Sequence, residues 1–122
     1  MSTGFVLQND KVLWFRGASL HRILAWTVTD FDLNEIEKEI VQSAFYGLDF
    51  EVTDETPDLI EKVRLTCESL LGRKTKIMDW PKVKNNLDPQ CFLSFEPSVL
   101  DIDQKSAARV IHFLDNNEGF AR

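Results

Sequence analysis

The sequence predicts a single domain of the α+β or α/β class, a small sandwich in which helices lie on a sheet. Residues 57–71 repeat apolar side chains at helical spacing, whereas residues 48–52 alternate apolar and acidic side chains with the period of a strand. The link at Gly47 between a helical pattern and this strand is short, which is typical of sheets covered by helices. No linker rich in Pro, Gly or Ser interrupts residues 1–122, so we assign them to one domain.

The chain opens with a predicted β-hairpin. The mainly apolar runs 5–8 and 11–15 flank Asn9 and Asp10, which tolerate the left-handed backbone of a tight turn. The apolar segment 20–28 follows, and its periodicity fits a third strand as well as a short buried helix.

A first helix is predicted near residues 32–46. Asp32 and Glu35 have the spacing of a capping box, and Gly47 ends the segment. The expected apolar stripe of this helix consists of Leu33, Ile36, Ile40, Val41 and Ala44.

The strand predicted at 48–52 has two different faces, since successive side chains point to opposite sides of a strand. We expect its apolar residues Leu48, Phe50 and Val52 to point inward. Asp49 and Glu51 are expected to point outward.

The second helix, at 57–71, has the clearest boundaries. Thr56 is expected to cap its first turn, Pro57 suits the first helical position, and Gly72 is expected to end it in the left-handed conformation. Its expected buried stripe consists of Leu59, Ile60, Val63, Cys67, Leu70 and Leu71.

Shorter elements separate this helix from the last one. They are a short strand at 74–78, one or two helical turns from Asp79, a loop at 85–89 and a last strand near 91–95. A third main helix is predicted near 99–116, with Asp101 or Asp103 as its cap.

The residue types predict no cofactor, no metal site and no catalytic residue. Cys67 lies on the apolar stripe of the helix predicted at 57–71 and Cys91 opens an apolar run, which favours two reduced, buried thiols over a disulfide or a nucleophile. His21 and His112 are each more than twenty residues from a cysteine, so no pair of zinc ligands forms locally. An Asp-x-Asp-x-Asn start of a calcium loop is followed by Glu35 where that loop requires glycine.

Charge is distributed unevenly along the chain, whose net charge is −6. Residues 30–61 contain eleven acidic residues and one basic residue, Lys38, whereas residues 62–84 contain seven basic residues and two acidic ones. An acidic chain repels nucleic acid, and no uncharged run approaches the roughly 20 residues of a membrane span. We therefore expect a cytoplasmic protein without nucleic-acid or membrane partners.

These patterns lead to a functional hypothesis. We expect a small, acidic, non-enzymatic protein that binds and neutralises a basic partner protein, in the manner of an immunity protein or antitoxin blocking a nuclease toxin. The residues expected to bind the partner are Asp49, Glu51, Asp54, Glu55 and Asp58. The alternatives are a regulatory or adaptor domain that docks through an apolar patch, and an enzyme with a pocket that the sequence does not reveal.

Overall fold

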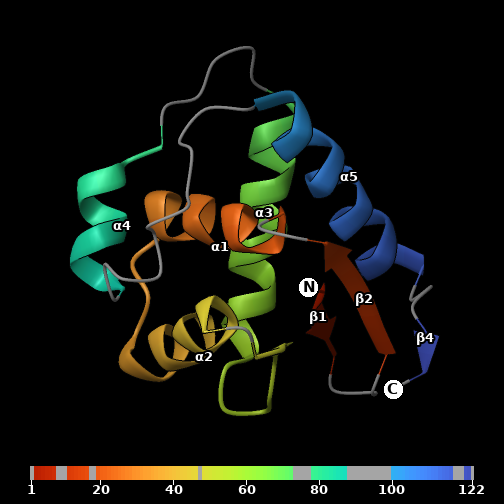
Figure 1. Ribbon diagram of the computed structural model, residues 1–122, viewed down its shortest axis with the longest axis horizontal. Helices are drawn as coiled ribbons and strands as arrows, with labels where there is room; N and C mark the ends of the chain where they lie inside the picture. Colours follow the sequence, from red (N-terminus) through yellow and green to blue (C-terminus); the bar gives the residue numbers. More distant parts are fainter. Residues whose placement is uncertain are drawn as a thin grey trace.

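The computed structural model describes residues 2–7, 11–16, 19–46, 48–72, 78–87, 100–116 and 120–121 (Figure 1). Its helices are α1 (Ser19–Asp30), α2 (Glu35–Phe45), α3 (Pro57–Leu71), α4 (Trp80–Asn86) and α5 (Leu100–Asn116). Its strands are β1 (Ser2–Val6), β2 (Lys11–Arg16), β3 (Phe50–Glu51) and β4 (Phe120–Ala121). One sheet combined with several helices confirms the α+β class.

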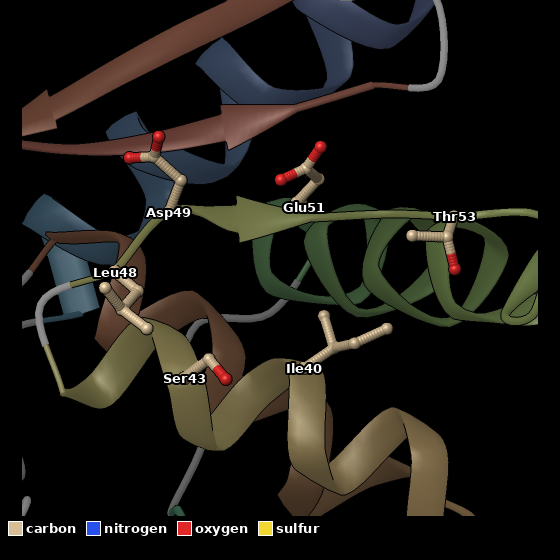
Figure 2. Close-up of a pocket in the computed structure, with 6 residues that line it drawn as sticks. All are labelled: Ile40, Ser43, Leu48, Asp49, Glu51 and Thr53. Carbon is tan, nitrogen blue, oxygen red and sulfur yellow. The ribbon is translucent and has the colours of Figure 1, made fainter.

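The strands form a sheet in the order β3-β1-β2-β4. β1 and β2 pair antiparallel, with Phe5 opposite Leu13, so the predicted N-terminal hairpin is confirmed. β3 pairs with β1 in parallel, with Phe50 opposite Phe5, and lies beside α2 at the edge of the sheet (Figure 2). Parallel strands need a long connection, which here includes α1 and α2. The strand predicted at 48–52 therefore exists, but only Phe50 and Glu51 form it.

The segment 20–28, whose periodicity fitted strand or helix, belongs to helix α1 in the middle of the molecule (Figure 1). Every residue from Arg22 to Val28 is buried, and the helix contacts α3, α4 and α5. A helix enclosed in this way has no wide polar face, so its sequence carries little of the 3.6-residue pattern.

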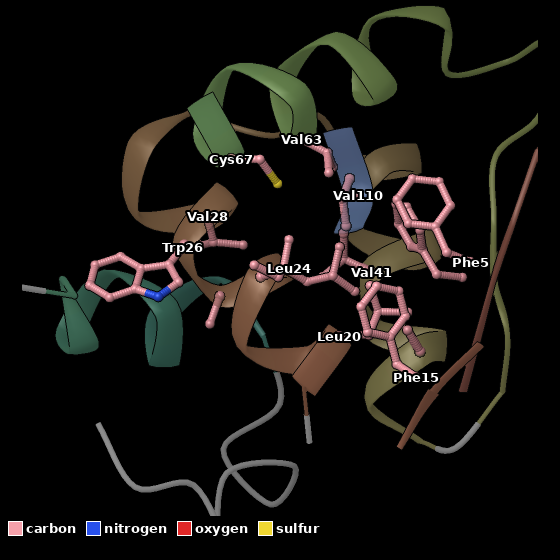
Figure 3. Close-up of a cluster of buried hydrophobic side chains, with 14 of the residues drawn as sticks. Phe5, Phe15, Leu20, Leu24, Trp26, Val28, Val41, Val63, Cys67 and Val110 are labelled. Atoms are coloured by element: carbon pink, nitrogen blue, oxygen red, sulfur yellow. The ribbon is translucent and has the colours of Figure 1, made fainter. Parts of the chain in front are cut away.

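The hydrophobic core lies between the sheet and the helices (Figure 3). On the sheet side, the ring of Phe5 meets the ring of Phe50 edge-on, with 5.0 Å between their centroids. The same ring meets Phe113 of α5 at 5.8 Å, also edge-on. Because aromatic rings bury large areas and favour this geometry, the cluster holds β1 against both β3 and α5.

The helix predicted at 57–71 is confirmed as α3, and its buried face contains Leu59, Val63, Cys67 and Leu70. Cys67 is a buried thiol, as expected, whereas Cys91 lies outside the described residues. The inclusion of Leu71 in the buried stripe was wrong, because its side chain is 46% exposed.

Pro57 begins α3, as expected, but the other two features expected at the ends of this helix were wrong. Thr56 precedes the helix, but its hydroxyl donates to the carbonyl oxygen of Thr53 at 3.4 Å and does not cap the first turn. Gly72 follows the helix at φ −87°, which is right-handed. The carbonyl oxygen of Leu70 instead accepts a hydrogen bond from the Gln104 side chain at 3.0 Å, so this end of the helix does not need a left-handed residue.

Helix α2 confirms the prediction near 32–46, but its capping box lies two residues later than expected. The Asn34 side chain accepts from the backbone N–H of Glu37 at 2.8 Å, and Glu37 Oε1 accepts from the backbone N–H of Asn34 at 3.0 Å. Asp32 instead pairs with Lys82 of α4 at 3.1 Å. The helix is rotated so that Glu37 is buried and Ile36, expected on the apolar stripe, is 44% exposed.

The helix predicted near 99–116 is confirmed as α5, and Asp79 caps α4 by accepting from the Lys82 backbone N–H at 3.1 Å. Neither Asp101 nor Asp103 is the N-cap, because both lie within the first turn of α5, and the Asp103 carboxylate is buried against α1. The predicted loop 85–89 was wrong at its start, since Asn85 and Asn86 belong to α4. The strand predicted at 91–95 lies outside the described residues, as does the one at 74–78 except for the buried, non-strand Met78.

Candidate binding surface

The five residues expected to bind a partner lie on the acidic segment (residues 49–58), which connects α2 to α3 through β3. Glu51 ends β3, Asp54 and Glu55 lie in the following turn, and Asp58 lies in the first turn of α3. These four side chains are exposed, whereas Asp49 is half-buried. The structure therefore presents four of the five carboxylates to solvent.

Asp49 is held against the sheet. Its Oδ1 atom accepts a hydrogen bond from the backbone N–H of Gly4 at 3.1 Å, across 45 positions of sequence. A Cβ atom on Gly4 would lie 3.0 Å from that oxygen and 2.9 Å from Cγ2 of Val12, so only glycine fits without movement. Asp49 therefore points away from the core, as expected, but its carboxylate lies over β1, where the backbone N–H of Gly4 holds it.

The turn that follows β3 is held by its own hydrogen bonds. The backbone N–H of Val52 donates to the carbonyl oxygen of Val6 at 3.1 Å and ties the start of the turn to β1. The carbonyl oxygen of Thr53 accepts from the backbone N–H of Thr56 at 3.1 Å as well as from its hydroxyl, and the Thr53 hydroxyl accepts from the N–H of Glu55 at 3.3 Å. These bonds present Asp54 and Glu55 on an anchored turn.

A groove separates the acidic segment from α2 (Figure 2). We name it the α2–β3 groove; it has a volume of about 460 Å³ and is lined by Ile40, Ser43, Leu48, Asp49, Glu51 and Thr53. In Figure 2, Asp49 and Glu51 stand on the same side of the 48–53 segment, while Ile40 and Ser43 face that segment from α2. The two carboxylates extend from the side of the segment away from α2, so they form the rim of the groove that is remote from Ile40.

Leu48 belongs to this groove and not to the core. The sequence predicted that Leu48 points inward, but its side chain is 62% exposed. Its backbone N–H donates to the carbonyl oxygen of Ser43 at 3.1 Å, which holds residue 48 to the end of α2. Strand alternation begins only at Phe50, so it does not extend to Leu48.

A second hollow lies on the other side of α2. It has a volume of about 480 Å³ and is lined by Glu35, Lys38, Glu39, Gln42, Ser43, Tyr46 and Asn86. Ser43 contributes to both hollows, and Tyr46 at the end of α2 is 59% exposed. Leu48 is thus an exposed apolar side chain in the groove beside the acidic segment, and Tyr46 is one in the neighbouring hollow.

Several acidic residues of the 30–61 block pair with bases within the fold. Glu37 is the most buried of them, with its side chain 1% exposed and Oε1 2.7 Å from Nζ of Lys62. Glu35 also has a basic neighbour, Lys38, at 3.3 Å. The Asn34–Glu37 spacing is itself that of a capping box, and this signal identifies Glu37 as structural from sequence. The carboxylates of Glu35 and Glu37 thus have basic neighbours within the fold.

Sequence reasoning missed a buried polar cluster between α1 and α5. Asp103 accepts hydrogen bonds from Nε and Nη2 of Arg22, at 2.6 and 2.8 Å, and from Nε1 of Trp26 at 2.8 Å. Asp103 lies four residues before Ala107 and seven before Val110, both of which are buried. This helical spacing places Asp103 on the buried face of α5, so the sequence did contain a signal for its position. The cluster joins two helices in the interior.

The described histidines differ in environment. The ring of His21 lies 5.0 Å from the ring of Phe45, centroid to centroid. Burial lowers the pKa of the His21 imidazole, and a hydrogen bond with the backbone of Ala44 opposes that shift. His112 is exposed on α5 beside Asn116, whose side chain lies 3.1 Å from its Nδ1.

Among the residues described here, no group of three or more His, Cys, Asp or Glu side chains could hold a metal ion. Within the same ranges, no helix has both the length and the apolar character needed to cross a bilayer. Comparisons with protein-family models, curated proteins and solved structures found no match to this chain. The surface chemistry is thus the basis for a functional proposal.

Proposed function

We propose that this protein is a small non-enzymatic binder that neutralises a basic partner protein through its acidic segment, in the manner of an immunity protein or antitoxin. One observation carries the proposal: Glu51, Asp54, Glu55 and Asp58 are all exposed on one short segment that is tied to the sheet at one end and to α3 at the other. An anchored surface loses less conformational entropy on binding than a loose loop of the same composition.

The apolar residues beside the segment favour a protein partner over a small cation. Tyr46 and Leu48, which directly precede the acidic residues in sequence, are 59% and 62% exposed. Protein interfaces combine aromatic and aliphatic anchors with a charged rim, and anchors of this kind supply most of the affinity. The carboxylates then contribute mainly specificity and speed of association.

The charge of the segment also suggests how neutralisation would work. A nuclease binds the phosphates of its substrate with Lys and Arg side chains. Exposed carboxylates on an anchored turn, as at Asp54 and Glu55, can take the place of those phosphates and cover the cationic site. Glu37 is unavailable for this role because it caps α2 and pairs with Lys62.

Affinity capture with matched baits tests the proposal. The wild-type protein is compared, in an extract of the native source, with the Asp54→Lys/Glu55→Lys variant and with a Glu68→Lys/Asp101→Lys control, and bound proteins are identified by mass spectrometry. The control reverses two exposed acids near the C-terminal end of α3, where Gln104 meets Leu70, and has the same net charge.

The expected result is a basic protein that the wild type and the control retain and that the Asp54→Lys/Glu55→Lys variant loses. Retention by all three baits that does not weaken at high salt would contradict the proposal. That outcome would favour an adaptor domain that docks through an apolar patch.

A further inference from the structure

Resting on the proposed function, we infer that the α2–β3 groove receives an arginine side chain of the basic partner protein. The alkyl stem packs against Ile40 and Leu48, and the guanidinium group lies at the rim formed by Asp49 and Glu51. This assigns to the groove a specific occupant within the larger interface of the acidic segment.

The apolar wall suits the stem of a long basic side chain. Ile40 is partly buried against the core, so it is held in place, and Leu48 is 62% exposed at the end of the groove. Arg and Lys commonly lay their methylene groups on apolar surface while the charged group stays at the edge. Covering Leu48 in this way also removes exposed apolar area from water.

The charged rim suits the guanidinium group. Figure 2 shows the side chains of Asp49 and Glu51 on the same side of the 48–53 segment, one just before β3 and one at its end. The hydrogen bond from Gly4 fixes the Asp49 carboxylate before any partner arrives. A planar guanidinium can bond a carboxylate with two parallel N–H groups, which an ammonium group cannot do, so arginine is favoured over lysine.

The volume of the α2–β3 groove is sufficient for an arginine side chain. A volume of about 460 Å³ lies within the range of roughly 300–1,000 Å³ found for ligand pockets. It accommodates one long side chain together with adjoining backbone. Ser43 and Thr53 also line the groove; the Ser43 hydroxyl donates to the carbonyl oxygen of Glu39, and the Thr53 hydroxyl accepts from the N–H of Glu55.

Titration of the ¹⁵N-labelled protein with short peptides tests the inference by NMR. The probe is acetyl-Gly-Arg-Gly-amide, and the comparison peptides replace arginine by lysine or by citrulline, which keeps the shape but has no charge. We expect amide shifts confined to the Ile40–Ser43 and Leu48–Thr53 stretches, with affinity in the millimolar range because one solvent-exposed ion pair contributes little. The lysine peptide should bind more weakly, and the citrulline peptide should cause no comparable shifts.

Two matched variants locate the site. Glu51→Gln should weaken arginine-peptide binding about two- to fivefold. Glu61→Gln removes an exposed charge from α3, outside both the acidic segment and the groove lining, so it should leave peptide binding unchanged. Equal effects of the two variants, or shifts spread over all acidic residues, would overturn the inference.

Failure of this inference differs from failure of the proposed function. If the peptide does not occupy the groove while the Asp54→Lys/Glu55→Lys variant still loses a basic partner, only the groove assignment is wrong. If the groove binds the arginine peptide but no partner depends on Asp54 and Glu55, the proposed function is wrong.

Discussion

Arg22 and Asp103, which are 81 positions apart in the sequence, form a buried ion pair that joins α1 to α5. Both N–H···O bonds are short, at 2.6 and 2.8 Å, and the Asp103 carboxylate also accepts from Trp26. The two residues are 7% and 1% exposed. A buried charge is stable only when it is paired, so removal of one partner is much more costly than removal of both.

Asp103→Leu should lower the free energy of unfolding by about 3–5 kcal/mol, because it leaves the Arg22 guanidinium buried without its carboxylate. The Arg22→Met/Asp103→Leu double variant should recover much of this loss, although the Trp26 N–H loses its acceptor in both. Urea unfolding of the wild type, Arg22→Met, Asp103→Leu and the double variant gives a double-mutant cycle for this pair. Additive effects of the single substitutions would show that the pair is not coupled.

Glu37 should contribute to stability twice, through the capping box and through Lys62. Glu37→Ala is expected to lower the free energy of unfolding by about 1–3 kcal/mol, since it removes the cap and leaves the Lys62 contact unmade. Glu37→Gln keeps an acceptor for the Asn34 N–H and should cost less. Glu39→Ala, on the exposed face of the same helix, should change stability by less than about 0.5 kcal/mol and serves as the control.

Substitution by alanine should change the free energy of unfolding in opposite directions at Gly4 and at Gly72. Gly4→Ala places a Cβ 2.9 Å from Val12 and 3.0 Å from Asp49, and overpacking of this kind costs about 1–3 kcal/mol. Gly72 has right-handed φ and no atom closer than 3.8 Å to an added Cβ, so Gly72→Ala should stabilise by about 0.4–1 kcal/mol.

Thermal unfolding measures both glycine substitutions, and NMR shifts at Asp49 report whether Gly4→Ala displaces the carboxylate. A neutral Gly4→Ala variant with unchanged Asp49 shifts would show that the contact with Gly4 does not position this residue.

His21 should make stability depend on pH. Its folded-state pKa lies below the ordinary value of 6.5, so the unfolded chain binds the proton first as the pH falls. The free energy of unfolding should therefore be greatest above pH 6.5 and should decrease as the pH drops through 6.5 toward the folded-state pKa. Urea unfolding from about pH 8 to about pH 5 measures this.

His21→Leu should flatten that decrease, while His112→Asn, on the exposed face of α5, provides the matched control. A decrease of the same size in the His21→Leu variant would assign the pH dependence to other groups.

The elements governed by local rules could be predicted from the sequence. Pro57 and the spacing of Leu59, Val63 and Leu70 determine α3 without reference to distant residues. The hairpin likewise follows from two adjacent runs and the turn between them. Where a side chain depends on a distant partner, local patterns failed: Asp103 looked like a helix cap because Arg22 is remote in sequence.

In the candidate site, too, features set by local sequence could be predicted and features that depend on distant residues could not. Glu51 is exposed, as strand alternation predicted, and the exposure of Asp54, Glu55 and Asp58 is typical of their residue type. The anchoring of Asp49 could not be predicted, because its donor belongs to Gly4 on another strand. The α2–β3 groove was also unpredictable, since it exists only when α2 lies beside β3 in space.

The central claim is that the acidic segment binds a basic partner, and the association rate of the captured partner tests it most directly. Stopped-flow measurements compare the wild type, Asp54→Lys/Glu55→Lys and Glu68→Lys/Asp101→Lys from about 50 mM to about 500 mM salt. The wild-type rate should fall at least about tenfold over this range, and Asp54→Lys/Glu55→Lys should associate more slowly at low salt with a flatter dependence. The control, at equal net charge, should stay close to the wild type. Identical rates for the two variants would contradict the claim, because net charge and not the acidic segment would then govern association.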